Sequence, residues 1–220
     1  SWNFAATAYL NRWKVKIYYE HYFDDHSQMF FQYGRWKDGH IGLEITFPKN
    51  RFIDTFVYEG LGTKDQTGPM LYDSFWGEFE EQISAKDNYY NHYLYQGWQH
   101  WGMGIGNPLL PGPIYNKNGQ ITFISNRVLA HHIGFCGSPC QSLSYRVLLS
   151  YSRHWGTYDN PLNEIKKQFN SLFEVTYAPQ QLKGWSFTVS GAMDRGSILG
   201  NNYGGMLVIR KQGIIKSGNK

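Results

Sequence analysis

The stretch LSYRVLLSYS, residues 143–152, alternates between two kinds of side chain. Successive side chains of a β-strand point to opposite faces, so this alternation predicts a strand with two unlike faces. One face carries Leu143, Tyr145, Val147, Leu149 and Tyr151, and the other carries Ser144, Arg146, Leu148, Ser150 and Ser152. The alternating segment runs from Ser142 to Trp155. It exceeds an ordinary strand of about 5–6 residues and suits a transmembrane strand of about 9–11.

The same period of two recurs in other parts of the chain. Residues 13–20, 41–47 and 185–190 each place apolar side chains on one face and polar ones on the other. Clusters of Gly, Pro, Asn and Asp, of the kind that forms turns, separate these segments. We expect roughly eight to ten strands in an all-β, antiparallel fold.

Composition narrows the class of protein. Of the 220 residues, 18% are aromatic and 17% are charged, against about 25% charged in a typical soluble domain. The mean hydropathy is −0.51, and no run of roughly 20 apolar residues predicts a transmembrane helix. The net charge of +4 is scattered, which argues against a nucleic-acid partner. Two classes remain open, namely a membrane β-barrel and a soluble β-sandwich or jelly roll that binds sugars.

An irregular, partly helical insertion is expected at residues 68–118. Residues 74–83 lack clean alternation, which favours a short helix, and residues 87–108 are rich in Tyr, Trp, Asn, Gly and His. Aromatic rings cover the apolar faces of sugars, while amides and imidazoles bond their hydroxyls. The predicted polysaccharide-binding residues are Tyr89, Tyr90, Asn91, His92, Tyr93, Trp98 and Trp101. An aromatic girdle at a membrane interface would give the same composition.

The acidic residues Glu78, Glu80 and Glu81 are compatible with a glycoside-cleaving enzyme, in which two carboxylates flank the scissile bond. A solvated face of a short helix explains them as well. No nucleophile or phosphate-binding motif is recognisable, so we expect no catalytic residues, no metal and no cofactor.

The two cysteines, Cys136 and Cys140, flank Gly-Ser-Pro. This spacing predicts a tight turn, across which a short-range disulfide could form in an oxidising compartment. Two free thiols at a turn are the alternative.

The block DNYYNH at residues 87–92, the stretch from Gly97 to Leu109, and the ending GGMLVIRK at 204–211 resemble the Wzi-type capsule-assembly family in its Bacteroidetes branch. The resemblance covers most of the chain and matches the C-terminal half of a typical member. It implies a barrel of about eighteen strands in the bacterial outer membrane. Proteins of this family act as surface lectins that retain capsular polysaccharide without bond chemistry.

The resemblance implies that residues 1–220 are a single barrel domain or the C-terminal portion of one. Eight to ten strands cannot close at the diameter of such a barrel, and open sheet edges are not tolerated in lipid. The expected partners are therefore surface polysaccharide, outer-membrane lipid, and either the remainder of the barrel or another outer-membrane protein.

Overall fold

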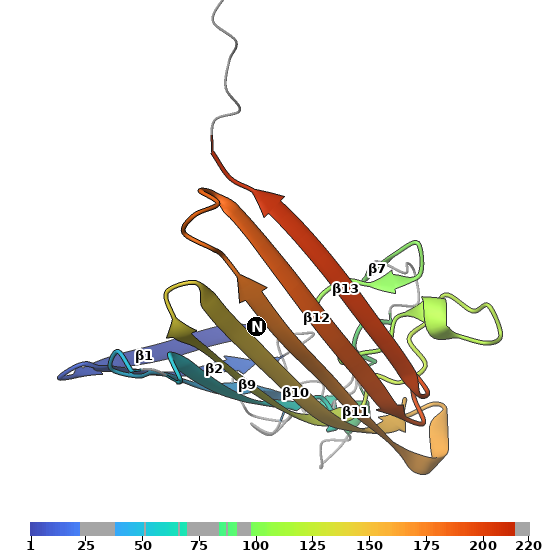
Figure 1. Ribbon diagram of the computed structural model, residues 1–220. Helices are drawn as coiled ribbons and strands as arrows, with labels where there is room; N and C mark the ends of the chain where they lie inside the picture. The colour runs from blue at the N-terminus through green and yellow to red at the C-terminus, as the bar shows by residue number, and fades with distance from the viewer. Residues whose placement is uncertain are drawn as a thin grey trace, which may run out of the picture.

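The computed structural model describes residues 1–22, 38–50, 52–65, 67–69, 84–86, 88–91 and 98–213. Its main element is one antiparallel sheet of nine strands, in the order β1-β2-β3-β4-β9-β10-β11-β12-β13. The strands are β1 (Trp2–Leu10), β2 (Trp13–His21), β3 (Gly39–Thr46), β4 (Thr55–Gly62), β9 (Val128–Cys140), β10 (Leu143–Gly156), β11 (Pro161–Tyr177), β12 (Trp185–Gly196) and β13 (Asn202–Lys211). The sheet is strongly twisted and curved, so β1 and β2 point in a different direction from β12 and β13 (Figure 1).

Smaller elements lie between β4 and β9. Two short antiparallel pairs join β5 (Thr67–Pro69) to β6 (Ser84–Lys86), and β7 (Gln99–His100) to β8 (Met103–Gly104). The 3-10 helix η2 (Pro113–Tyr115) follows them. In the part of the chain that the structure describes, no helix has both the length and the apolar character to cross a membrane.

The alternating segments are strands, as the sequence predicts. Residues 13–20, 41–46 and 185–190 belong to β2, β3 and β12, and the long segment that ends near Trp155 is β10, with 14 residues. Nine strands in the main sheet lie within the expected number. The helix expected at 74–83 falls outside the described residues.

Cross-strand pairing gives the sheet one continuous apolar face. Residues that pair across an antiparallel ladder point to the same side. Val147 pairs with Phe135 and Phe173, and the ladder continues on the same face through Phe56 and Ile45 to the N-terminal strands. Successive rows over β10–β13 are Leu143/Tyr177/Phe187/Ile209, Tyr145/Val175/Val189/Leu207, Val147/Phe173/Gly191/Gly205 and Leu149/Ser171/Met193/Tyr203.

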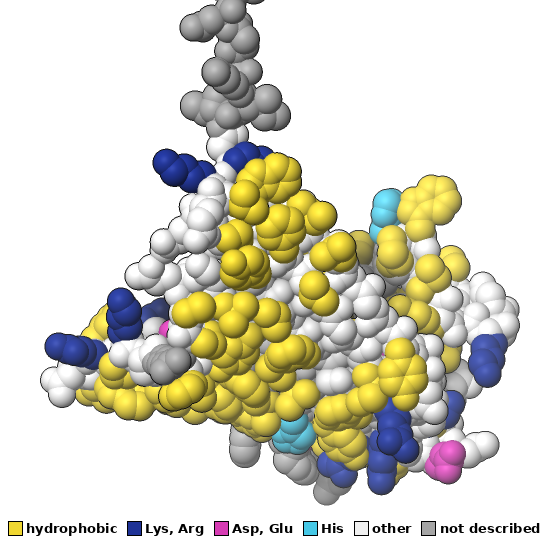
Figure 2. Space-filling model, viewed as in Figure 1, with side chains coloured by type: hydrophobic (Ala, Val, Ile, Leu, Met, Phe, Trp, Pro, Cys, Tyr) yellow, Lys and Arg dark blue, Asp and Glu magenta, His cyan; other side chains and the backbone are white. Residues whose placement is uncertain are grey.

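This apolar face is exposed. Phe173 retains 55% of its accessible surface, Val189 60% and Leu207 65%. Hydrophobic side chains gather over the strands from β9 to β13, and Lys and Arg side chains lie at the margins (Figure 2). The opposite, polar face carries charged groups such as Lys16, Glu59 and Arg146.

The two longest connections lie at one end of the sheet, and shorter connections occur at both ends. At one end, which we call the turn end, two-residue turns join β1 to β2 and β9 to β10. Asn11 begins the first of these turns with φ +57°, which Asn tolerates better than most residues. At the other end, the loop end, residues 22–38 join β2 to β3 and residues 63–127 join β4 to β9.

The tight turn predicted between the cysteines is wrong, and of the two alternatives for the thiols the structure has the free pair. Cys136 and Cys140 are free thiols on one strand, β9, and the chain reverses at Gln141 and Ser142 instead. Four residues of extended strand separate their Cα atoms by about 13 Å, beyond the roughly 4.4–6.8 Å of a disulfide. The register between β9 and β10 shifts by one residue here. Pro139 is accommodated in this bulge, which sequence reasoning mistook for a turn.

Candidate functional site

The connection between β4 and β9 is tied together at its two ends. It spans residues 63–127, wider than the predicted insertion at 68–118. Thr63 Oγ1 donates a hydrogen bond to the carbonyl oxygen of Asn126 at 2.7 Å, and the backbone N–H of Val128 donates to Thr63 Oγ1 at 3.0 Å. These bonds fix where the connection leaves and re-enters the sheet. Two of its described stretches, residues 88–91 and 98–127, together form the insertion.

The insertion packs against the polar face of the sheet. Leu110 is buried with Leu61, Val128 and Ala130, which lie on the polar side of β4 and β9 at the loop end. Leu109 packs against the same cluster. The buried core of the described residues therefore lies between the insertion and the polar face, while the apolar face stays uncovered.

Asparagine side chains hold the insertion in shape. Asn91 Oδ1 accepts a bond from the backbone N–H of Phe123 at 2.8 Å, and Asn91 Nδ2 donates to the Phe123 carbonyl at 2.9 Å. Asn126 Nδ2 donates to the carbonyl of Tyr89 at 2.7 Å and to Asn88 Oδ1. The amide of Asn91, predicted to bind polysaccharide, is thus used to hold two parts of the insertion together.

Three predicted binding residues line a cavity with a volume of about 700 Å³. These are Tyr89, Tyr90 and Trp98, and the sheet contributes His40 from β3 to the same wall. The ring centroids of Tyr90 and Trp98 lie 5.6 Å apart at 51°. Tyr89 is nearly buried and donates its hydroxyl to Asp38 Oδ2 at 3.1 Å. The cavity therefore offers an aromatic wall with a fixed hydrogen-bonding group behind it.

Tyr22, just beyond the end of β2, contributes a hydroxyl to this cavity. Burial, and next the charge of Glu20, raise the pKa of Tyr22 well above its ordinary value. Its phenol therefore stays protonated throughout the physiological range, and a neutral hydroxyl both donates to and accepts from a ligand.

The other predicted binding residues do not join this wall. Trp101 is 83% exposed at the turn between β7 and β8, where its ring meets His100 edge-on at a centroid distance of 6.2 Å. His92 and Tyr93 lie outside the described residues, as do Glu78, Glu80 and Glu81.

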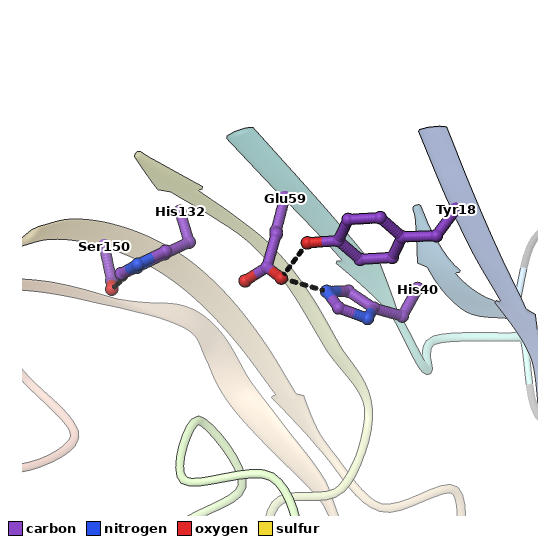
Figure 3. Close-up of polar contacts among 5 residues, drawn as sticks. All are labelled: Tyr18, His40, Glu59, His132 and Ser150. Carbon is purple, nitrogen blue, oxygen red and sulfur yellow. Dashed lines mark hydrogen bonds and ion pairs between the residues drawn. The ribbon is translucent and has the colours of Figure 1, made fainter. Parts of the chain in front are cut away.

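A second polar cluster, which sequence reasoning missed, lies on the polar face around Glu59 (Figure 3). The Tyr18 hydroxyl donates to Glu59 Oε1, and His40 Nε2 lies 3.5 Å from the same oxygen. His132 pairs across the ladder with Glu59, and its Nδ1 lies 2.7 Å from Ser150 Oγ. Tyr18, Glu59, His132 and Ser150 lie in one cross-strand row, and His40 joins Glu59 from the neighbouring row. Five strands therefore bring together a phenol, a carboxylate, a hydroxyl and two imidazoles.

A glycine makes this arrangement sterically possible. Tyr18 reaches Glu59 across β3, where its cross-strand partner is Gly42. A Cβ at position 42 would collide with the Tyr18 ring. The absence of a side chain there lets the ring lie flat on the backbone of the central strand.

The insertion closes part of this row into smaller cavities. Asn107, Pro108 and Leu109 cover a cavity of about 240 Å³ that is lined by His40, Glu59, His132 and Ser150. A neighbouring cavity of about 260 Å³ is lined from the sheet by Ser152, His154, Gln168 and Asn170. His40, Asn107 and Pro108 also line the cavity of about 700 Å³, so the polar groups continue from the aromatic wall along the sheet.

The chemistry of these groups suits hydroxyl-rich ligands. Imidazole, amide, hydroxyl and carboxylate groups donate to and accept from hydroxyls, and the aromatic wall offers apolar contact. Among the described residues, no group of three or more His, Cys, Asp or Glu side chains is placed to hold a metal ion.

Comparison of the chain with models of known families, with curated proteins and with solved structures gave no match.

Proposed function

We propose that this chain forms part of a bacterial outer-membrane β-barrel that binds capsular or other surface polysaccharide without cleaving it. The observation that carries the proposal is the inverted packing of the sheet. The insertion covers the polar face and leaves the apolar face exposed. A sheet in a water-soluble protein buries its apolar face instead. A membrane barrel turns its apolar face to lipid and its polar face to the lumen.

The size of the apolar face supports contact with lipid. Nine strands spaced by about 4.8 Å, with about eight residues of 3.3 Å each, cover roughly 1,000 Å². The largest apolar patch on a soluble monomer is typically about 300–600 Å². The second sheet of a β-sandwich would have to cover this face, and no strand of the described residues does so.

The height of the face also matches a bilayer. On β10 the apolar positions run from Leu143 to Tyr151, and Arg153 is the first charged residue beyond them on that face. The ten steps from Leu143 to Arg153 measure about 33 Å along the strand, which at a tilt of about 40° puts roughly 25 Å between the first apolar position and the first charge. The apolar band of outer-membrane barrels is about 25 Å tall.

The two edge strands require neighbours in this setting. β1 and β13 pair on one side only within the described residues, and most of their side chains are exposed. Unpaired backbone groups are not tolerated in the hydrocarbon region. We therefore propose that further strands pair with both edges, supplied by the remainder of a barrel or by another outer-membrane protein.

The two longest connections, both at the loop end, suggest an orientation. Outer-membrane barrels have short periplasmic turns and longer extracellular loops. The 63–127 connection, which carries the aromatic wall, leaves from the loop end. In this orientation the cavity of Tyr90 and Trp98 lies toward the cell exterior, where polysaccharide is. The resemblance of residues 87–92 and 97–109 to the Wzi-type family favours the same function.

Trp98 and Trp101 form a matched pair for a binding test. Trp98 is half exposed on the cavity wall, whereas Trp101 lies outside it. Trp98→Ala should weaken binding of purified capsular polysaccharide about tenfold or more, as loss of an aromatic anchor does, and Trp101→Ala should change it less than twofold. Equal losses of binding in the two variants would contradict the assignment of the cavity as the polysaccharide-binding site.

A glycoside-cleaving enzyme is the rival function. Incubation of the protein with the same polysaccharide should release no new reducing ends. Release that disappears in a Glu78→Gln, Glu80→Gln or Glu81→Gln variant would replace the lectin proposal with the enzyme.

A further inference from the structure

The apolar face ends abruptly at the loop end in a set of basic residues. Arg153 of β10 and Lys167 of β11 are direct cross-strand partners. Arg195 of β12 pairs with Phe169, two residues from Lys167, so the three cations are neighbours on the same face. The row before them still contains Tyr151 and Phe169, which places cations next to the last aromatic residues.

Aromatic rings organise further cations beside this set. The Arg153 guanidinium carbon lies 5.4 Å from the centroid of the Trp155 ring, and Lys64 Nζ lies 5.2 Å from the same centroid. Arg127, whose Nε donates to the Lys64 carbonyl, stacks on Tyr158 at 3.7 Å. The loop end therefore presents fixed cations at the edge of the apolar face.

These cations have no acidic partners in the described structure. Like charges directly opposite on neighbouring strands destabilise a sheet, so the pair of Arg153 and Lys167 calls for a compensating anion. Asp159 and Glu164 lie in the same hairpin, but no ion pair among the described residues joins either to Arg153, Lys167 or Arg195. Among the described residues the charge of these cations is not compensated, so the site can accept the anion of a ligand.

We propose that Arg153, Lys167 and Arg195 bind the phosphorylated headgroup of a lipid in the leaflet at the loop end. This inference rests on the membrane placement proposed above. The acyl chains would lie on the rows of Leu149, Tyr151 and their partners, and the phosphate would meet the cations at the boundary. Guanidinium groups match phosphate oxygens with paired hydrogen bonds, which an ammonium group alone does not provide.

The geometry favours a lipid over a free phosphate ion. The three cations lie at the margin of a continuous apolar face, and none of them lines the polar cavities of the other face. A ligand that contacts both surfaces has an anionic head and apolar chains. Arginine and lysine side chains at the edge of an apolar band extend toward the headgroup region in the same way.

The test uses the protein isolated from membranes in a neutral detergent, with native mass spectrometry as the readout. The probes are dioleoyl phosphatidic acid and, as the uncharged counterpart, dioleoylglycerol. The test variant carries Arg153→Gln, Lys167→Gln and Arg195→Gln. The control variant loses the same charge at the turn end through Arg12→Gln, Lys49→Gln and Lys183→Gln, all exposed in turns.

Each basic residue near an anionic headgroup contributes about fivefold in affinity, so the test variant should bind phosphatidic acid on the order of a hundredfold more weakly. The control variant should bind phosphatidic acid as the wild type does, and dioleoylglycerol should bind to none of the three proteins. Equal affinity of the test variant and the wild type would overturn the site, as would displacement of the lipid by millimolar inorganic phosphate. A chain that stays in solution without detergent would instead contradict the membrane placement itself.

Discussion

Arginine at Val189 should be far more disruptive than arginine at Ala192 on the same strand. Val189 lies on the apolar face of β12, between Trp185 at the turn end and Arg195 at the loop end. Four residues separate it from Trp185, about 13 Å along the strand and roughly 10 Å in depth at a tilt of about 40°. Ala192 is exposed on the opposite, polar face, where it pairs with Leu172 and Gly204.

The magnitude follows from the position of Val189 near the middle of the apolar band. An arginine on the lipid face costs about 2–4 kcal/mol at the bilayer midplane. Exposed substitutions away from special features cost about 0.5 kcal/mol or less, which is the expectation for Ala192→Arg. The two variants add the same side chain and charge to one strand, so the difference between them reports which face meets lipid.

The assay is urea unfolding of the protein folded into phospholipid vesicles, followed by the shift in gel mobility between folded and unfolded forms. Val189→Arg should lower the free energy of unfolding by about 2–4 kcal/mol relative to Ala192→Arg. Equal losses in the two variants, or a larger loss in Ala192→Arg, would refute the assignment of the apolar face to lipid.

Three further predictions concern the fold and the insertion. Gly42→Ala should destabilise the protein by about 1–3 kcal/mol in the same unfolding assay, because the new Cβ displaces Tyr18 from Glu59. The control, Gly191→Ala, should leave the stability unchanged, because no atom lies within 4 Å of its new Cβ. Equal effects of the two substitutions would contradict the packing at Gly42. Cys136 and Cys140 should both react with iodoacetamide before reduction, and Cys140 should react faster because it is exposed. The reaction is followed by intact mass, and thiols that become reactive only after reduction would contradict the prediction. Asn126→Ala should destabilise the local structure of the insertion by about 1–3 kcal/mol, because it removes two hydrogen bonds to Asn88 and Tyr89. The readout is hydrogen exchange, which should become faster at residues 88–91 and 122–127. Unchanged exchange would show that the Asn126 hydrogen bonds do not hold the insertion together.

The strands and their two faces could be predicted because both depend on local pattern. The alternation at 143–152 fixes which side chains share a face whatever the strand pairs with. The packing of the insertion could not be predicted in this way. It depends on contacts between distant residues, such as Thr63 with Asn126, and on the choice of face, which is set by whether water or lipid surrounds the sheet.

The candidate site was predicted in part for the same reason. Tyr89, Tyr90 and Trp98 lie close together in sequence, so composition was sufficient to single them out. The Glu59 cluster comes from separate strands, and only the register that pairs Glu59 with Gly42 and His132 brings its members together. In the sequence, the residues of this cluster are marked only by their positions on the polar faces of alternating strands.

The cysteine prediction failed because Gly and Pro have more than one use in a sheet. Gly137 and Pro139 favour a turn in isolation, but β10 pairs with β9 along this segment and turns the extra residue into a bulge. The energy of the long hairpin outweighs the local preference for reversal.

The proposed function requires that one face of the sheet meets lipid and the other meets water. A scan of β12 with single nitroxide spin labels at residues 186–194 tests it most directly, in protein reconstituted into bilayers after replacement of Cys136 and Cys140 by serine. The account predicts that collisions with oxygen, which dissolves in lipid, peak at 187, 189, 191 and 193, while collisions with a water-soluble nickel complex peak at the even positions. An absence of alternation, or the reverse alternation, would contradict it.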